Sequence, residues 1–166
     1  HPGGNMDRHR SWAERYGFTL RFSPGRHVSA PHQDFRYHPT REEMLRLAAI
    51  FLSTDVMVNL SSTVALESCL ADRPTICAFF GKPFDWIGWR RSMIVRDFRE
   101  HYADLIRGGG VAVSRNQQEL IQQIRTYLEH PENDRNGRRR SAELIATTLA
   151  GDASERVLAI LKRLIT

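Results

Sequence analysis

The sequence has little of what marks secreted or membrane-spanning proteins. Its 166 residues include only two cysteines, Cys69 and Cys77, and these lack the spacing of metal ligands. They are expected to be small buried thiols in a reducing compartment, the cytoplasm. No apolar run approaches the roughly 20 residues that a membrane span needs. The sequence therefore predicts neither a disulfide framework nor a transmembrane helix.

Lysine is also scarce. Lys82 and Lys162 are the only two, so nearly all of the positive charge is carried by arginine. The net charge is +5, but the basic residues are scattered among acidic ones, and Arg138–Arg140 is the one sharp cluster. A nucleic-acid-binding protein gathers such residues on one face. The pattern instead favours a solvated surface with one or two phosphate-facing arginines, and nucleic acid is not expected as a partner.

The length and composition predict a single soluble domain over residues 1–166, with helices over 138–165 at its end. Buried strands alternate with helices, which predicts an α/β fold with a Rossmann-like parallel sheet. We expect a strand at 18–22 and an irregular segment at 26–39. The capping boxes Thr40-x-x-Glu43 and Ser114-x-x-Gln117 predict the starts of two further helices.

The beginning of the sequence does not fit a whole Rossmann-like domain, which opens with a buried strand. Here His1-Pro2-Gly3-Gly4 leads directly into a helix expected at about 7–16. Such a tetrapeptide is typical of the loop that follows a strand. We therefore expect the leading strand, and a domain before it, to lie upstream of residue 1.

The most informative segment is 55–80, which has the pattern of strand, turn, helix and strand. The apolar run from Val56 to Leu60 is typical of a parallel strand covered on both faces. A second run, Thr75–Phe80, follows Pro74, which ends the intervening helix. Two parallel strands joined by a helix form a right-handed βαβ unit. The turn between strand and helix then lies at the carboxyl end of the first strand.

That turn, Ser61-Ser62-Thr63, is rich in hydroxyl groups. Free backbone N–H groups and the helix dipole favour an anion at a helix start, and hydroxyls add donors for a phosphate or diphosphate. Simple helix capping by Ser or Thr is an equally good explanation of the turn taken alone.

Glu67 favours ligand binding over capping. In a capping box with Ser62 or Thr63 the acid would stand at Ala65 or Leu66. Glu67 therefore has no capping partner, and its carboxylate can accept hydrogen bonds from a ribose diol. The alternative is a general attraction of its charge to the helix N-terminus.

The string SST-x-x-x-E followed by RPT-I resembles the nucleotide-binding half of GT-B glycosyltransferases. His1-Pro2 is similar to the His-Pro element of bacterial capsule and sialyl transferases and of CDP-glycerol glycerophosphotransferases. The tail from Gly109 to Arg156 resembles the end of related surface-polysaccharide transferases. The likeness covers most of the chain, most densely at 40–80 and 100–156. It implies that the sequence is the C-terminal, donor-binding half of such an enzyme.

By this resemblance Ser61, Ser62 and Thr63 hold the phosphates of a UDP-, CDP- or CMP-linked donor. Glu67 binds the ribose, and His1 hydrogen-bonds a donor phosphate. The whole enzyme transfers a sugar or glycerol-phosphate group to a saccharide or lipid-linked acceptor, and peripheral membrane association is a further expectation. The catalytic base belongs to the missing N-terminal domain, and no cofactor or metal is required.

The remaining candidates are a histidine and an arginine in the second half of the chain. His101 can meet a phosphate or the leaving group as a cation or proton donor; otherwise it is a surface histidine of a helix. Arg156 can face phosphate or pair with a nearby acid. His27, His32 and His38 have no repeated ligand spacing, so no metal site is predicted.

Two other functions are compatible with the same turn. SST-x-x-x-E also occurs in sugar-nucleotide 2-epimerases, which need carboxylates beside the sugar C2. A lone Rossmann-like domain can also be a nucleotide-binding module without catalytic activity. Incubation of a full-length version with UDP-N-acetylglucosamine in the absence of an acceptor separates the epimerase from the transferase.

Overall fold

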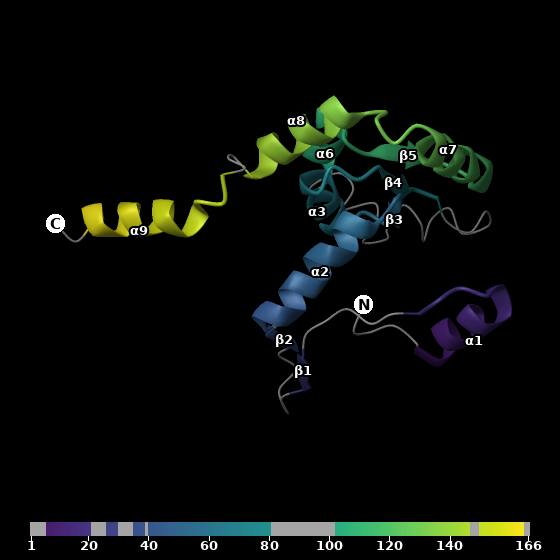
Figure 1. Ribbon diagram of the computed structural model, residues 1–166, viewed down its shortest axis with the longest axis horizontal. Helices are drawn as coiled ribbons and strands as arrows, with labels where there is room; N and C mark the ends of the chain where they lie inside the picture. The colour runs from purple at the N-terminus through teal and green to yellow at the C-terminus, as the bar shows by residue number, and fades with distance from the viewer. Residues whose placement is uncertain are drawn as a thin grey trace, which may run out of the picture. The chain divides into compact units, whose positions relative to one another are not determined.

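The computed structural model describes residues 6–20, 26–29, 35–38, 40–80, 102–146 and 150–164. Its contacts divide the chain into two compact units, residues 1–50 and 51–166. The first unit contains α1 (Met6–Tyr16), β1 (Arg26–Ser29), β2 (Phe35–His38) and most of α2 (Arg41–Ser53). The second contains β3 (Met57–Asn59), α3 (Val64–Leu70), β4 (Thr75–Ala78), α6 (Ala103–Gly108), β5 (Ala112–Ser114), α7 (Gln117–Glu129), α8 (Arg135–Ala146) and α9 (Ala153–Leu164) (Figure 1).

Helix α2 begins at the predicted capping box. The N–H of Thr40 donates to Glu43 Oε2 at 2.7 Å, and the N–H of Glu43 donates to Thr40 Oγ1 at 3.2 Å. Two backbone donors at the helix start are thereby satisfied reciprocally. The prediction from the sequence is confirmed at this helix.

Two expectations for the first unit are wrong. Residues 18–20 form no strand: after Gly17, at φ +69°, the N–H of Phe18 donates back to Ala13 O at 3.2 Å and closes helix α1. Residues 21 and 22 lie outside the described residues. The segment expected to be irregular instead contains the antiparallel hairpin β1–β2, in which Arg26 pairs with His38. Its prolines, Pro24, Pro31 and Pro39, lie outside the described residues.

The second unit contains a parallel sheet of three strands in the order β3-β4-β5. The α/β fold and the βαβ unit β3–α3–β4 are confirmed, and the arrangement is compatible with a Rossmann-like fold. The expectation that the first strand is covered on both faces is wrong, because Val58 is 41% exposed. The middle strand β4 is buried along its whole length, since it has a neighbour on each side.

In the second unit α8 packs against both α3 and α6, α3 packs against β4, and α7 packs against β4 and β5. Both cysteines belong to the hydrophobic core cluster of this unit and are free thiols, as expected. Burial raises the pKa of Cys69 to about 11. The buried residues of the cluster are Ala65, Cys69, Cys77, Tyr102, Leu105, Val111 and Ala142.

A glycine junction, Gly108–Gly110 against Gly137, joins α6 to α8. Gly109, at φ +77°, ends α6 in the left-handed conformation that favours glycine. A Cβ added at Gly137 would collide with the carbonyl group of Gly109, so only glycine permits this approach. Ser141 completes the contact, because its hydroxyl donates to Leu105 O at 2.7 Å and accepts from the N–H of Gly110 at 3.1 Å.

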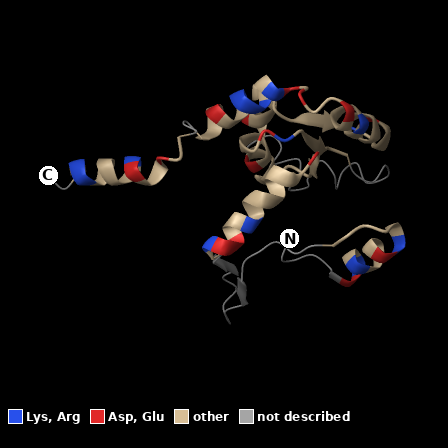
Figure 2. Ribbon diagram, in the orientation of Figure 1, with Lys and Arg blue, Asp and Glu red and all other residues tan. Residues whose placement is uncertain are grey.

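The arginine cluster 138–140 is part of this packing. Arg138 is 1% exposed and donates to Asp72 Oδ1 at 2.8 Å and to two backbone carbonyls. Arg139 pairs with Glu143 at 2.9 Å, and Arg140 donates to Gly108 O at 3.2 Å. Figure 2 shows charges of both signs along α8. The cluster therefore binds its own chain and forms no single-sign patch.

The later helices begin at other residues than predicted. Helix α7 is capped by Asn116, whose side chain accepts the N–H of Glu119 at 2.9 Å; the expected cap Ser114 instead donates to Gln123 Oε1. Two capping patterns overlap in this sequence, and the one outside strand β5 forms the cap. Helix α8 begins at Arg135, three residues before the expected start. Helix α9 begins at Ala153, close to the expected position.

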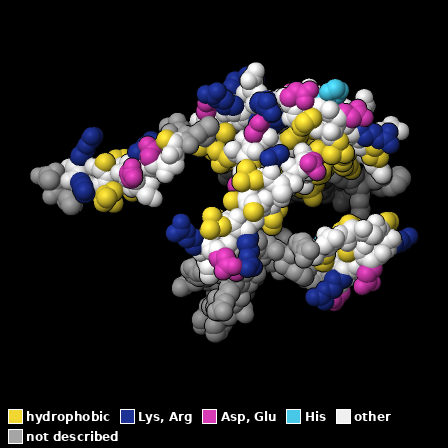
Figure 3. Space-filling model, viewed as in Figure 1, with side chains coloured by type: hydrophobic (Ala, Val, Ile, Leu, Met, Phe, Trp, Pro, Cys, Tyr) yellow, Lys and Arg dark blue, Asp and Glu magenta, His cyan; other side chains and the backbone are white. Residues whose placement is uncertain are grey.

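Several apolar side chains remain on the surface of α2 and α9 (Figure 3). On α9 they are Val157, Leu158, Ile160, Leu161 and Leu164. In the described ranges, no helix combines the length and the apolar character needed to cross a membrane.

Candidate functional site

The hydroxyl-rich turn lies at the carboxyl end of β3, as predicted, and leads into α3. In the sheet register Asn59, the last residue of β3, stands beside Cys77 of β4. Ser61 has φ +51°, a left-handed conformation that is unfavourable for a residue other than glycine. Such a residue costs about 1–3 kcal/mol and is kept only where its surroundings fix it. The turn is thus a strained loop held in place by its neighbours.

Hydrogen bonds inside the turn involve mainly Ser62. Its N–H donates to Asn59 Oδ1 at 3.3 Å, and its hydroxyl accepts the N–H of Val64 at 3.4 Å. Its carbonyl accepts the N–H of Ala65 at 3.0 Å. Ser62, the residue before the N-cap, therefore satisfies backbone N–H groups at the start of α3.

The other two hydroxyl residues of the turn have different surroundings. Ser61 Oγ lies 3.8 Å from Cys77 Sγ, so this hydroxyl is directed at the sheet. Thr63 occupies the N-cap position of α3, is exposed, and makes no side-chain capping bond. Of the three hydroxyls grouped by the sequence pattern, that of Thr63 is the one both exposed and uncommitted to the helix end.

Glu67 lies on α3 four residues after Thr63, one helical turn further along. The residue as a whole is exposed, yet partial burial of its carboxyl group raises its pKa above the ordinary value. An exposed, partly desolvated carboxylate next to an open turn can accept hydrogen bonds from vicinal hydroxyls. Thr63 and Glu67 are the predicted site residues that the structure brings close together on one helix.

A polar cluster of Asn59, Cys77 and Tyr102 lies beside the turn on its core side, and it was not predicted from the sequence. The hydroxyl of Tyr102 donates to Asn59 Oδ1 at 2.6 Å, although the two residues are 43 positions apart in the chain. Burial raises the pKa of Tyr102 above its ordinary range, and burial likewise raises that of Cys77. Asn59 Nδ2 is buried and has no hydrogen-bond partner. A polar residue at a strand end was a signal for Asn59; nothing local indicated Tyr102.

The remaining predicted residues are His1, His101 and Arg156. His1 and His101 lie outside the described residues. Arg156 is exposed on α9, and within the described part of the chain no hydrogen bond or ion pair joins it to residues 61–63.

Among the described residues, the turn coincides neither with a group of metal-binding side chains nor with the surface hollow beside α7. Among the residues that the structure describes, no group of three or more His, Cys, Asp or Glu side chains is placed to hold a metal ion. A hollow of about 460 Å³ lies beside α7, where the hydroxyl of Tyr127 donates to Asp134 Oδ2 at 2.6 Å. Its lining contains none of the predicted site residues.

Comparison with protein-family models, with curated proteins and with solved structures finds no match to the chain.

Proposed function

We propose that the chain binds a nucleotide-activated donor at the β3–α3 turn, as the donor-binding part of a glycosyltransferase-type enzyme. The donor is a UDP-, CDP- or CMP-linked sugar or glycerol phosphate, and the acceptor is a saccharide. The phosphates would lie against the turn at residues 61–63, and the ribose hydroxyls against Glu67. His1 and His101 would assist at the phosphate.

The observation that carries this proposal is the pairing of an open hydroxyl with a carboxylate one turn along the same helix. Thr63 is exposed and leaves its hydroxyl available, and Glu67 keeps an exposed, partly desolvated carboxyl group. A hydroxyl donor such as that of Thr63 suits phosphate oxygens, whereas a carboxylate suits the two hydroxyls of a ribose. One nucleotide satisfies both groups at once.

In such an enzyme the turn contributes to catalysis as well as to binding. Negative charge develops on the departing nucleotide phosphate when the donor bond breaks. Donors already oriented toward that position stabilise the transition state without reorganising. The strained conformation of Ser61, at φ +51°, is the kind of fixed backbone that provides this orientation.

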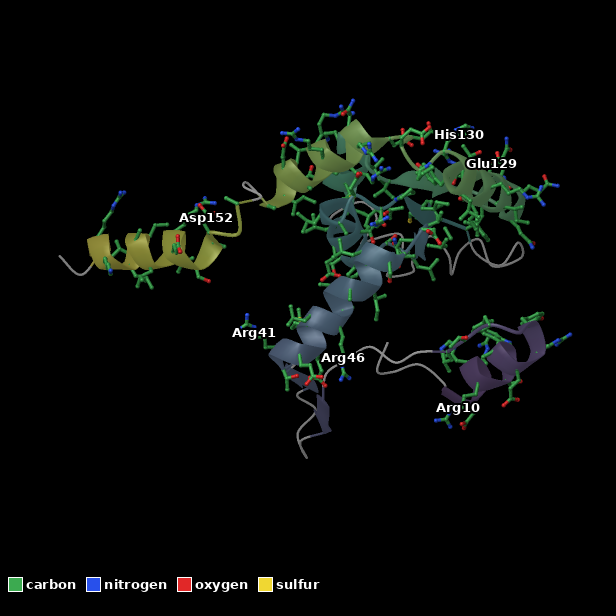
Figure 4. All side chains as sticks on the ribbon, viewed as in Figure 1. Arg10, Arg41, Arg46, Glu129, His130 and Asp152 are labelled. Atoms are coloured by element: carbon green, nitrogen blue, oxygen red, sulfur yellow. The ribbon has the colours of Figure 1, made fainter. Side chains whose placement is uncertain are left out.

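Titration calorimetry with UDP, CDP and CMP tests the proposal. We expect Glu67→Ala to weaken the binding of the preferred nucleotide by about ten-fold or more, because it removes charge-assisted hydrogen bonds to the ribose. The matched control is Glu129→Ala, which removes an exposed carboxylate from the far end of α7 (Figure 4). Absence of binding by the unmodified chain, or a Glu67→Ala variant that binds normally, contradicts the proposal.

A second measurement separates transfer from epimerisation. The protein is incubated with UDP-N-acetylglucosamine in the absence of an acceptor, and the sugar is analysed. A transferase leaves the configuration at C2 unchanged, whereas an epimerase inverts it.

A further inference from the structure

Tyr102 and Asn59 form a buried connection beneath the turn that holds the nucleotide phosphates in the proposed function. Asn59 Oδ1 accepts two hydrogen bonds, one from the Tyr102 hydroxyl at 2.6 Å and one from the N–H of Ser62 at 3.3 Å. The same oxygen therefore joins the turn to a residue distant in sequence.

Tyr102 has the properties of a fixed anchor. It is 1% exposed, and its ring belongs to the core cluster with Ala65 and Cys77. Asn59 is itself fixed by the sheet, since it pairs with Cys77 in the parallel register. The Tyr102 hydroxyl can therefore hold the Asn59 side chain in place, and Asn59 in turn can hold the N–H of Ser62 in the turn.

The turn needs such support because Ser61 is in the left-handed conformation, at φ +51°. The hydrogen bond to the N–H of Ser62 acts on the residue directly after Ser61. A second contact, between Ser61 Oγ and Cys77 Sγ at 3.8 Å, holds the strained residue from the sheet side. Loss of the Asn59 contact leaves the backbone of the turn free to relax.

We propose that Tyr102 is a positioning residue for the phosphate-binding turn, acting through Asn59 on the N–H of Ser62. This inference rests on the proposed function, since it assigns no contact between Tyr102 and the nucleotide. The Tyr102 hydroxyl would affect the affinity of the site for phosphate groups, whereas Glu67 would recognise the nucleoside.

The test compares Tyr102→Phe with Tyr127→Phe in the full chain. Both tyrosines are buried, and each donates its hydroxyl at 2.6 Å, but Tyr127 does so to Asp134, away from the turn. We expect Tyr102→Phe to weaken binding of UDP or CDP, whichever binds more tightly, by about five-fold, the effect of one hydrogen bond. Binding of the corresponding nucleoside stays unchanged. Tyr127→Phe lowers the unfolding midpoint without changing either affinity.

The outcomes distinguish the two proposals. If the unmodified chain binds neither UDP nor CDP, the proposed function fails and this inference fails with it. If the unmodified chain binds but Tyr102→Phe binds equally well, only the positioning role is overturned. The same holds if the variant loses nucleoside and diphosphate affinity alike, or if Tyr127→Phe has the same effect.

A double-mutant cycle with Asn59→Ser provides a second measurement, which remains available if one variant folds poorly. Because both residues act through one oxygen, the double variant should weaken diphosphate binding by no more than the stronger single variant. If the loss of affinity in the double variant equals the product of the losses in the two single variants, the residues act independently and the inference is overturned.

Discussion

The glycine junction between α6 and α8 and the turn between β3 and α3 belong to the same compact unit but are built in opposite ways. At the junction, Ser141 and Arg140 satisfy the backbone groups they meet, and the helices approach until no side chain fits at Gly137. At the turn, Ser61 has a strained, left-handed backbone conformation and Thr63 is exposed, with its hydroxyl uncommitted. The junction therefore stabilises the fold, whereas the turn keeps polar groups that are available to a ligand.

The largest effect is expected at the junction. Gly137→Ala places a methyl group against the carbonyl of Gly109, and we expect it to lower the free energy of unfolding by about 3 kcal/mol. Urea unfolding measures the loss. The control is Gly151→Ala, at φ +75° with nothing near its Cβ position, which should cost about 1 kcal/mol through backbone strain alone. Equal losses for the two variants would contradict close packing at the junction.

An intermediate effect is expected at the ion pair beside the junction. Asp72→Asn leaves the buried guanidinium of Arg138 without its carboxylate, although the backbone carbonyls remain as acceptors. We expect a loss of about 2 kcal/mol, below that of a fully buried pair, because the Asp72 side chain is 47% exposed. Thermal unfolding measures it. Glu143→Gln, which breaks the exposed pair with Arg139, should cost less than about 0.5 kcal/mol.

The smallest effect is expected at the turn and depends on pH. The pKa of Glu67 is raised by partial burial, so the folded state binds the proton more tightly than the unfolded state. Its contribution to stability is therefore fully present at low pH and is lost as the pH rises through the folded pKa. Glu67→Gln should remove this dependence, as measured by urea midpoints over a pH series. An unchanged pH profile in the variant would contradict partial burial of the carboxyl group.

Much of the fold could be predicted because its signals are local. The capping box Thr40-x-x-Glu43 and the strand–turn–helix–strand pattern at 55–80 both depend on residues close in sequence. The strand expected at 18–22 was wrong because a strand depends on more than its local sequence. It also needs a partner strand, which the residues of the segment do not specify.

The candidate site was predictable in outline but not in detail. The pattern located the turn and Glu67, yet it treated three hydroxyls as equivalent, whereas Ser61 faces Cys77 and the Ser62 hydroxyl accepts the N–H of Val64. Which hydroxyl remains available depends on the φ angle of one residue and on the neighbouring strand. The contact of Tyr102 with Asn59 joins residues 43 positions apart, and no spacing rule predicts such a pair.

The reactivity of the two buried thiols can also report the transient opening of the core around them. Cys69 donates to Gly110 O at 3.7 Å within the core, and a thiol whose pKa is about 11 is almost wholly uncharged near neutrality. An alkylating reagent should thus reach it only during transient opening of the helices that cover it. The labelling rate would then measure the free energy of that opening without an added probe.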